Sequence, residues 1–401
     1  MRVLFSTTAG AGHFGPMVPI AKACAAAGHE VRVAAPLSFA PTVAANGFVH
    51  EPFPDVPGDV KGPFLAGLVR LPPAESNVRV LREVFCRLDA QAALPTLTSL
   101  LDRWRPDMVL REPCEFGSLA AAEAAHVPHA QVANGMGSLE LWAREHLAEP
   151  LAELGAKAGL PSDRLADAAA LEVVFTSVPE RLDEAGTRTD HGRARTYRYR
   201  YATSVPRKAT MPPPWGDPRR PLVYVSYGSV AGGFTKFVQM FRLTLEALAD
   251  SPVRVLLTVG NGCDPASLDP LPANAHVERW WPQEQVMPDT AVVVGHGGFG
   301  TTMIAIAAGV PQLVIPLFAI DQRINAKRVA ATAVGMRLDG GSVAAGQVAA
   351  HVRHLIEDPT HQREARRMAK EMAAMPSASD VVSVIATLAR SATEGAHPQA
   401  S

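Results

Sequence analysis

The chain has 401 residues, and 47% of them are hydrophobic. A chain of this length is too long for one ordinary hydrophobic core, so we expect two soluble globular domains of roughly 150–200 residues each. Its 38 basic and 39 acidic residues leave a net charge of −1, which argues against a nucleic-acid partner. The four cysteines lack metal-ligand spacing, no run of about 18 apolar residues occurs, and the N-terminus lacks a signal-peptide cleavage site, so we expect a cytoplasmic protein without stable membrane insertion.

The first half of the chain begins as a βαβ unit. A strand at Arg2–Thr7 leads through a turn at Ala9–Gly15 into a helix from Pro16 to Ala27, and the next strand is Val31–Ala35. Pro16 suits a first helical turn. The crossover of such a unit is right-handed and its strands are parallel. Further elements of the same kind are expected at Met108–Leu110, Gly117–Ala125 and His129–Val132.

Two segments rich in proline and glycine separate these patterns. Residues Pro54–Pro73 are long for a connection, which predicts a functional loop that covers a bound ligand. At 205–221 the composition shifts towards proline, which predicts a stiff linker between domains. The predicted organisation is therefore an N-terminal domain at 1–204, the linker at 205–221, a C-terminal domain at 222–375 and a last helix within 376–392.

The second half repeats the α/β pattern of the first. Strands are expected at Leu222–Ser226, Val253–Val259, His276–Arg279, Ala291–Gly295 and Gln312–Pro316, with helices at Thr235–Ala249 and Asp380–Ala389. Apolar runs of this length between turn residues are typical of strands buried on both faces of a parallel sheet. The sequence thus predicts an α/β protein of two Rossmann-like, doubly wound domains.

The turn from His296 to Gly300 joins a predicted strand to a helix that starts at Thr301-Thr302. Glycines at such a turn let backbone N–H groups approach an anion, and the helix N-terminus adds partial positive charge. The strand at Gln312–Pro316 then brings Asp321-Gln322 to the same edge of the sheet. A diphosphate cradle beside hydroxyl-binding polar residues indicates a nucleotide-sugar site.

Both halves also contain a literal G-x-G-x-x-G, at Gly10–Gly15 and at Gly295–Gly300. Each follows a strand and opens a helix, as the dinucleotide fingerprint requires. The first unit, however, has Ala34-Ala35-Pro36 where an acidic residue would hold the ribose. An NAD-dependent oxidoreductase is therefore the alternative enzyme class, and a non-catalytic accessory protein is the alternative without chemistry.

Four pieces occur in a fixed order: Trp280-Trp281-Pro282-Gln283, the turn from His296 to Thr302, Gly309-Val310-Pro311, and Asp321-Gln322. Together they resemble the nucleotide-sugar signature of the GT-B glycosyltransferases that tailor antibiotics, such as the calicheamicin (enediyne), macrolide and glycopeptide glycosyltransferases. The resemblance covers nearly the whole chain. It implies two Rossmann-like domains that face each other across a cleft, and a last helix that crosses back to the first domain.

His13 is the predicted catalytic base. A loop histidine by itself is more often a hydrogen-bonded structural residue, but the family places its base in a Gly-His turn after the first strand, matched here by Gly12-His13. A carboxylate that orients the imidazole would follow the neighbouring strand, and the match is Glu112. Many relatives carry Asp there, so Glu115 remains a competitor, and Asp107 is interpreted as structural.

The resemblance also assigns the donor site. It implies phosphate contacts from Ser229 and His296, from the N–H groups of Gly297, Gly298 and Gly300, and from Thr301 and Thr302. Gln283 should lie near the nucleoside, and Asp321 and Gln322 should bind the sugar hydroxyls. Trp280 matches the aromatic residue that stacks on the base, although Trp281 stands where relatives carry a smaller residue, which leaves open which indole is the platform.

Relatives that use UDP-sugars often place a Glu eight residues after the signature histidine, where this chain has Ile304. A deoxyribose needs no such partner, which favours a dTDP-deoxysugar over a UDP-sugar. No D-x-D or metal-ligand cluster occurs, so an inverting reaction without metal or cofactor is expected. The partners are then the donor and a lipophilic acceptor such as a polyketide or enediyne, and a homodimer stays open. Acceptor-binding candidates are Phe64, Leu68, Phe85, Met136 and Trp142.

Overall fold

The computed structural model describes residues 1–68, 71–185, 189–190, 193–194, 196–201, 212, 214–339 and 343–395. The chain folds as two compact units. Unit 1 comprises 1–177, the described residues of 185–200, and 376–395, and unit 2 comprises 178–184 and the described residues of 201–375. Residues 202–211 and 213, which include most of the predicted linker's first half, and the tail at 396–401 lie outside the described residues.

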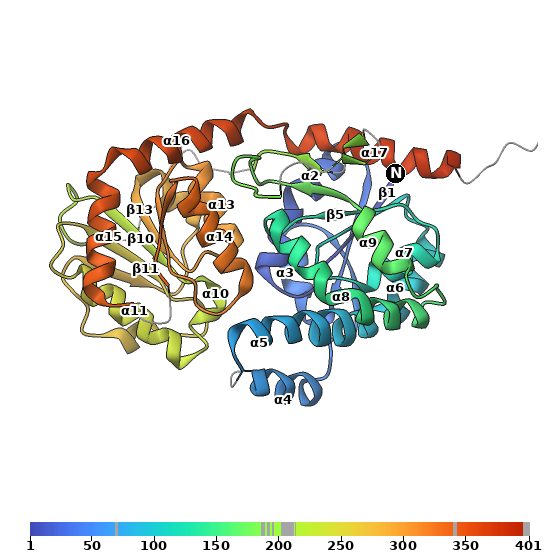
Figure 1. The fold of residues 1–401 in the computed structure, drawn as a ribbon, viewed down its shortest axis with the longest axis horizontal. Coiled ribbons are helices and arrows are strands. Elements are labelled where there is room, and N and C mark those ends of the chain that lie inside the picture. The colour runs from blue at the N-terminus through green and yellow to red at the C-terminus, as the bar shows by residue number, and fades with distance from the viewer. Residues whose placement is uncertain are drawn as a thin grey trace, which may run out of the picture. The chain divides into compact units, whose positions relative to one another are not determined.

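Unit 1 is built on a parallel sheet (Figure 1). Its order is β3-β2-β1-β4-β5-β6-β9. The strands are β1 (Arg2–Ser6), β2 (Glu30–Pro36), β3 (Val49–Phe53), β4 (Met108–Arg111), β5 (His129–Val132), β6 (Val173–Thr176) and β9 (Thr196–Arg198), and β7 (Thr189–Asp190) pairs with β8 (Arg193–Ala194) as a separate ribbon. The order reverses direction between β1 and β4, which is the topological switch point where ligands bind in doubly wound sheets.

Helices cover both faces of this sheet. They are α1 (Ala11–Phe14), η1 (Gly15–Met17), α2 (Val18–Ala26), η2 (Leu37–Phe39), α3 (Ala40–Ala45), α4 (Gly58–Leu68), α5 (Pro73–Arg79), the π-helix η3 (Val80–Asp89), α6 (Ala90–Trp104), α7 (Gly117–Ala124), α8 (Gly137–Lys157), α9 (Arg164–Leu171) and α17 (Ala378–Gly395). Along β1, Val3 and Phe5 pack on one side with α2 and α17, and Leu4 packs on the other with α6. Because both faces of the sheet are covered, successive residues of a strand are all buried, and the strands are therefore continuous apolar runs in the sequence.

Unit 2 repeats the arrangement with the order β12-β11-β10-β13-β14-β15, all parallel. Its strands are β10 (Leu222–Ser226), β11 (Arg254–Thr258), β12 (Ala275–Glu278), β13 (Thr290–Gly295), β14 (Gln312–Val314) and β15 (Gly335–Arg337). Its helices are α10 (Gly228–Ala231), α11 (Thr235–Leu248), η4 (Pro265–Leu268), α12 (Gln283–Val286), η5 (Met287–Asp289), α13 (Phe299–Ala307), α14 (Ile320–Ala331), α15 (Ala345–Glu357) and α16 (Pro359–Ala374). The switch point here lies between β10 and β13.

The segment Pro54–Pro73, predicted to be a loop, instead contains the helix α4 and the start of α5. Val60, Phe64 and Leu68 recur every four residues and give α4 one apolar side, of which Leu68 is buried. Pro63 lies inside this helix. The prolines and glycines of the segment outweighed that periodicity in the sequence-based prediction, which was wrong for this reason.

Two segments pack with the unit that their position in the chain does not suggest. Residues 178–184 belong to unit 2, where Arg328 donates hydrogen bonds to the carbonyl oxygens of Arg181 and Leu182 and the Arg181 guanidinium pairs with Glu364. Helix α17 belongs to unit 1 through buried Ile385. In the described part of the chain, no single helix is long and apolar enough to cross a membrane; one bent pair of helices, α16 with residues 378–391, meets the length and composition test jointly.

Candidate active site

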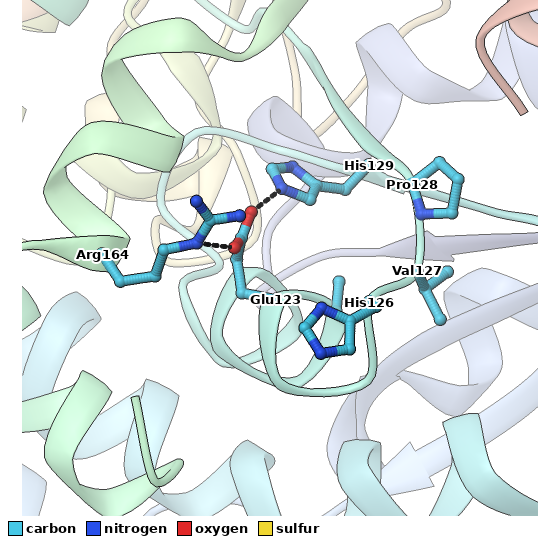
Figure 2. A pocket seen from close by; sticks show the side chains of 7 residues that line it. Glu123, His126, Val127, Pro128, His129 and Arg164 are labelled. Carbon is cyan, nitrogen blue, oxygen red and sulfur yellow. Dashed lines mark hydrogen bonds and ion pairs between the residues drawn. The ribbon is translucent and has the colours of Figure 1, made fainter. Parts of the chain in front are cut away.

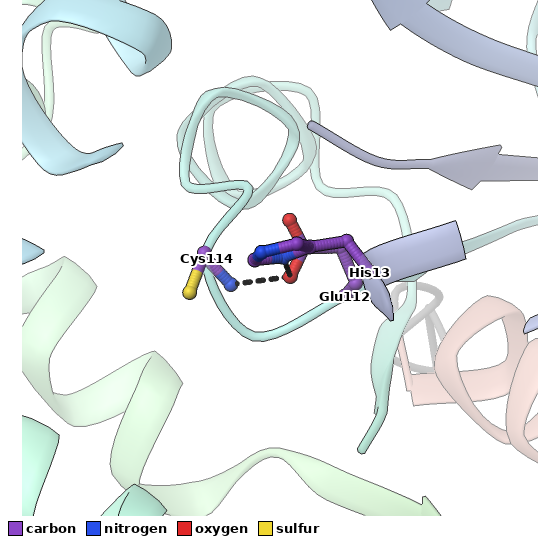
Figure 3. A group of neighbouring side chains, drawn as sticks. All are labelled: His13, Glu112 and Cys114. Carbon is purple, nitrogen blue, oxygen red and sulfur yellow. Dashed lines mark hydrogen bonds and ion pairs between the residues drawn. The ribbon is translucent and has the colours of Figure 1, made fainter. Parts of the chain in front are cut away.

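The switch point of unit 1 brings His13 and Glu112 together. Ser6 and Arg111 are paired in register on β1 and β4, so the residues that follow them leave the sheet at the same edge. The His13 Nδ1 atom lies 3.0 Å from Glu112 Oε2 (Figure 3). A turn at Gly10, with φ 144°, precedes the short helix that carries His13. An imidazole held through Nδ1 by a carboxylate keeps Nε2 for proton transfer.

Glu112 is fully buried and surrounded by hydrogen-bond donors. Its Oε1 accepts from Thr8 N at 3.2 Å and Thr8 Oγ1 at 2.8 Å, and its Oε2 accepts from Cys114 N at 2.8 Å and Asn134 Nδ2 at 3.2 Å, besides His13. Thr8, Cys114 and Asn134 were not identified from the sequence. Their common signal is position, because each follows a strand at the carboxyl edge of this sheet.

These contacts set the charge of the pair. Burial by itself lowers the pKa of His13, but the Glu112 carboxylate outweighs it and raises the pKa well above 6.5. Burial opposes ionisation of Glu112, but His13 and the donors around the carboxylate lower its pKa. The free site therefore favours an imidazolium–carboxylate pair, and the His13 side chain keeps 26% of its surface exposed.

The other acidic candidates have different roles. Glu115 is buried and accepts hydrogen bonds from Ser118 N at the start of α7, and burial raises the pKa of its carboxyl group. Asp107 lies before β4, where it accepts a hydrogen bond of 2.7 Å from Arg2 N. The structure thus brings Glu112, and not the competing Glu115, to His13.

His13, Glu112 and Cys114 also offer atoms of metal-ligand type within 4.8 Å of one another (Figure 3). The Glu112 oxygen atoms, however, already accept hydrogen bonds from five protein donors. A cation at this carboxylate would have to displace donors that the fold supplies. The donor set therefore fits a hydrogen-bonded dyad better than a metal centre.

Buried charges support the turn that carries Glu112. The Arg111 guanidinium is 1% exposed and donates to the carbonyl oxygens of Glu112, Pro113 and Glu115 at 3.2–3.4 Å. Its other N–H groups form a two-pronged ion pair with Glu172, at 3.1 and 2.6 Å. The carbonyl contacts tie the backbone of the turn to the core of unit 1.

The same network continues to the surface of unit 1. His129 donates to Glu172 through Nδ1 at 2.7 Å and to Glu123 through Nε2 at 2.8 Å. Arg164 also donates to Glu123, and His129, Glu123 and Arg164 line a shallow surface pocket (Figure 2). Burial lowers the pKa of His129, but its two carboxylate partners raise it to about 9. Both ring nitrogens donate, which requires the protonated form that this pKa gives.

The acceptor candidates differ in their surroundings. The Phe85 ring lies 5.5 Å from the His13 ring, and Phe85 comes from the π-helix η3. Phe85 and Trp142 are partly buried against the core, Phe64 is half-buried on α4, and Leu68 and Met136 are buried. Exposed apolar side chains nearby in the chain are Leu65 and Leu141. Phe85 is therefore the candidate that the structure brings to the base.

The switch point of unit 2 carries the glycine turn. β10 ends at Ser226 and β13 at Gly295, which are paired in register, so Ser229 and His296 follow neighbouring strand ends. At Gly297 φ is 87°, and a Cβ there would lie 2.6 Å from Val314 Cγ1. A Cβ at Gly228 or Gly298 would lie within 2.7 Å of His296 Nε2. Glycine is thus required where the turn passes the His296 ring and β14.

Removal from water lowers the pKa of His296 to about 4, so its imidazole is neutral near pH 7. Its Nδ1 atom is buried without a hydrogen-bond partner among the described residues. Thr301 accepts a hydrogen bond of 3.1 Å from Gln283 Nε2, whereas Thr302 is buried with its hydroxyl likewise unpartnered within the described chain. A neutral imidazole and a hydroxyl at a helix N-terminus are suited to hold an anion.

Asp321 and Gln322 lie in the first turn of α14. The Gln322 side chain is buried, and its Oε1 accepts from Leu317 N at 2.9 Å and Phe318 N at 3.1 Å. One turn later, buried Asn325 donates to the Gly297 carbonyl at 2.7 Å and so ties α14 to the glycine turn. Asn325 was not predicted, although its spacing of three residues from Gln322 places both on one side of the helix.

The two indoles have different environments. Trp280 is 67% exposed, whereas Trp281 packs against the apolar cluster that includes Tyr224 and Ile304. A base stacks on one open face of an aromatic ring, and Trp281 is partly buried whereas Trp280 is exposed. Of the two, Trp280 has the surface that a stacking platform needs.

Comparison with known proteins agrees with this geometry. Two family models, described as Erythromycin biosynthesis protein CIII-like, match the chain, the N-terminal domain at residues 74–184 and the C-terminal domain at 242–388. The L-demethylnoviosyl transferase of Streptomyces niveus is 33% identical, over 98% of this chain and all of the relative. The TDP-daunosamine transferase DnrS of Streptomyces peucetius is 28% identical, over 97% of each.

The structure of CalG4, a calicheamicin glycosyltransferase, superposes with a TM-score of 0.77 at 23% identity, over 96% of this chain and 98% of CalG4. The GT-B fold and the family resemblance expected from the sequence are thereby confirmed. The chain therefore belongs to the antibiotic-tailoring glycosyltransferases of the erythromycin CIII-like family and is itself a glycosyltransferase.

Proposed function

We propose that this glycosyltransferase moves a deoxysugar from a dTDP-sugar to a hydroxyl group of a lipophilic natural product, with inversion at the anomeric carbon and without a metal ion. The observation that carries the proposal is the His13–Glu112 pair at the switch point of unit 1, 3.0 Å apart. Its counterpart is the glycine turn at the switch point of unit 2. The first suits deprotonation of an acceptor, and the second suits a diphosphate.

In the proposed reaction the acceptor oxygen attacks the anomeric carbon from the face opposite the diphosphate. The bond from that carbon to the phosphate oxygen breaks, and the diphosphate leaves with the bonding electrons. The hydroxyl proton passes to His13 Nε2, and the Glu112 carboxylate stabilises the imidazolium that forms. A single displacement of this kind inverts the configuration at the anomeric carbon.

Charge on the leaving diphosphate would be met by the glycine turn. The N–H groups at the start of α13 and the Thr301 hydroxyl are neutral donors of the kind that bind developing negative charge. Ser229 is exposed at the neighbouring strand end. We therefore assign His296, Gly297, Gly298, Gly300, Thr301 and Ser229 to the diphosphate, Trp280 to the base, and Asp321 with Gln322 to the sugar.

The donor nucleotide is inferred from one side chain and one relative. Ile304 is buried among apolar neighbours, where relatives that use UDP-sugars often carry a Glu for the ribose. The 28% identical relative DnrS is named as a TDP-daunosamine transferase. Both observations favour a dTDP-deoxysugar.

Titration calorimetry with dTDP, UDP and NAD, with and without Mg²⁺, tests the donor site. We expect dTDP to bind more tightly than UDP, with no effect of Mg²⁺ and no binding of NAD. UDP binding as tight as dTDP would contradict the nucleotide assignment, and binding of NAD alone would contradict the reaction.

Replacement of His13 by Ala tests the base. Because His13 is assigned to proton transfer, turnover should fall by about 10²–10⁴-fold while dTDP affinity in unit 2 stays close to wild type. The matched control is His50→Ala, in the same unit, whose side chain contacts the Ala35 carbonyl on β2. Wild-type turnover in His13→Ala would remove His13 from the mechanism.

A further inference from the structure

The junction of α15 and α16 in unit 2 holds a cluster of side chains that no step of the proposed reaction uses. His354 lies in the last turn of α15, Asp358 joins the two helices, and His361 lies in the first turn of α16. One ligand atom of each lies within 4.8 Å of the other two. Two imidazoles and one carboxylate form a donor set that Zn²⁺ and its neighbours in the first transition row accept.

The His361 ring is already oriented for ligation. Its Nδ1 atom lies 2.9 Å from the Ala333 carbonyl oxygen. A carbonyl can only accept, so the proton is on Nδ1 and the lone pair is on Nε2. Histidines that bind metals characteristically donate their other ring N–H to a backbone carbonyl in this way.

Asp358 divides its two oxygen atoms between different tasks. Oδ1 accepts a hydrogen bond of 2.8 Å from Thr360 N and so caps α16. Oδ2 lies 3.4 Å from His354 Nε2. In a tetrahedral zinc site with metal–ligand bonds of about 2.0–2.1 Å, neighbouring ligand atoms are roughly 3.3–3.4 Å apart. This pair of atoms is therefore spaced for one shared ion.

The two histidine rings do not stack and block each other. Their centroids are 5.6 Å apart and their planes are inclined at 74°. The His354 side chain is half exposed and the Asp358 side chain is 33% exposed, so an ion can reach the cluster from solvent. Solvent access also leaves room for water at the remaining position of the ion.

We propose that His354, Asp358 and His361 bind a divalent transition-metal ion, with Zn²⁺ as the ion that best fits two imidazoles and one carboxylate. The bound ion would clamp the end of α15 to the start of α16. Gln362, the next residue, donates a hydrogen bond of 2.7 Å to the Gly309 carbonyl just after α13. The clamp would thus brace the packing of α16 on the helix that follows the glycine turn. This proposal does not depend on the proposed donor or acceptor.

Zn²⁺ affinity of the full-length, metal-stripped protein, measured by competition with a chromophoric chelator, tests the site. We expect one ion per chain in the wild type. His354→Ala should weaken binding by roughly 10–100-fold or more, since even residues behind the ligands change metal affinity by that factor. The control is His351→Ala, a partly exposed histidine one turn earlier on α15 whose Nδ1 contacts the Gln347 carbonyl. Equal affinities in wild type and His354→Ala, or loss of binding only in His351→Ala, would overturn the proposal.

Co²⁺ spectroscopy separates this site from the His13, Glu112 and Cys114 group, which contains a thiol. Binding at the α15–α16 junction should give visible ligand-field bands without a thiolate-to-cobalt charge-transfer band, and Cys114→Ser should leave them unchanged. A charge-transfer band that disappears in Cys114→Ser and persists in His354→Ala would place the ion elsewhere and refute the assignment. Because dTDP binding is not used as a readout, failure here leaves the proposed function untouched.

Discussion

At the scale of single residues, the pairing of His13 with Glu112 predicts the pH dependence of the reaction. Glu112 raises the pKa of His13 above 6.5. The fraction of His13 that is neutral, and can therefore accept a proton, increases as pH rises through that pKa. We expect kcat/KM to increase with pH, with a midpoint above 6.5. In Glu112→Gln the midpoint should move to lower pH and the plateau should fall by about 10²–10⁴-fold. The measurement is the pH profile of initial rates.

Stability should follow the same pair with a defined sign. A raised folded-state pKa of His13 means that the ion pair stabilises the protein fully below the unfolded value of about 6.5, and that this contribution is lost as pH rises through the folded pKa.

For the pH profile of rates, Glu115→Gln is the matched control for Glu112→Gln, because Glu115 contacts Ser118 instead of His13. A pH profile shifted by Glu115→Gln and unchanged by Glu112→Gln would exchange their assignments.

At the scale of an element, the glycine turn between β13 and α13 combines a structural requirement with the diphosphate binding that we propose. Gly297 adopts φ 87°, and a Cβ there would lie 2.6 Å from Val314 Cγ1. Gly300 lies inside α13, and a Cβ there would meet no atom within 4 Å. Gly297 is therefore needed by the backbone conformation and close packing of the turn. Gly300 is not needed by the fold, so a requirement for glycine there would come from a ligand.

Alanine at each glycine tests this separation. Gly300→Ala should keep the protein as stable or stabilise it by about 0.4–1 kcal/mol, but weaken dTDP binding, since its Cβ occupies space assigned to the diphosphate. Gly297→Ala should lower the free energy of unfolding by more than 1 kcal/mol, because φ and space are both unsuitable. Thermal unfolding and dTDP calorimetry distinguish the two effects, and unchanged dTDP affinity in Gly300→Ala would argue against a diphosphate at this turn.

At the scale of the whole molecule, the last helix stabilises a unit that it does not follow in the chain. α17 comes after unit 2 but belongs to unit 1, where Ile385 is fully buried beside Val381. Ile385→Ala should lower the free energy of unfolding of unit 1 by about 2–5 kcal/mol. Thr387→Ala, an exposed change two residues further along α17, should cost less than about 0.5 kcal/mol.

The readout for Ile385→Ala is differential scanning calorimetry together with dTDP titration. The nucleotide site is assigned to unit 2, so dTDP affinity should be retained at temperatures where unit 1 remains folded. Loss of dTDP affinity in Ile385→Ala, with no change in the unfolding of unit 1, would contradict the assignment of α17 to unit 1 as a stabilising element.

The sequence by itself determined most strands of the two sheets and the two switch-point turns, whereas β3, β6, β9 and β15 were not predicted. Buried parallel strands such as β10 and β13 are contiguous apolar runs in the sequence, and the glycine turn at His296–Gly300 is likewise a contiguous segment. Local signals of this kind need no long-range contact to be recognised. The family resemblance could be predicted because its motifs are contiguous in sequence. The resemblance in turn implied the pairing of His13 with Glu112, and the structure has the two side chains 3.0 Å apart.

Only the tertiary structure decided which side chains complete the site. Asn134 and Thr8 contact Glu112 from separate strand ends. These contacts join residues that are far apart in the sequence, so no local sequence pattern predicts them. The proposal of Trp280 rather than Trp281 as the stacking platform rests on burial, which is a property of the packed core. The helix α4 escaped prediction because its apolar period at Val60, Phe64 and Leu68 is weak beside its prolines and glycines.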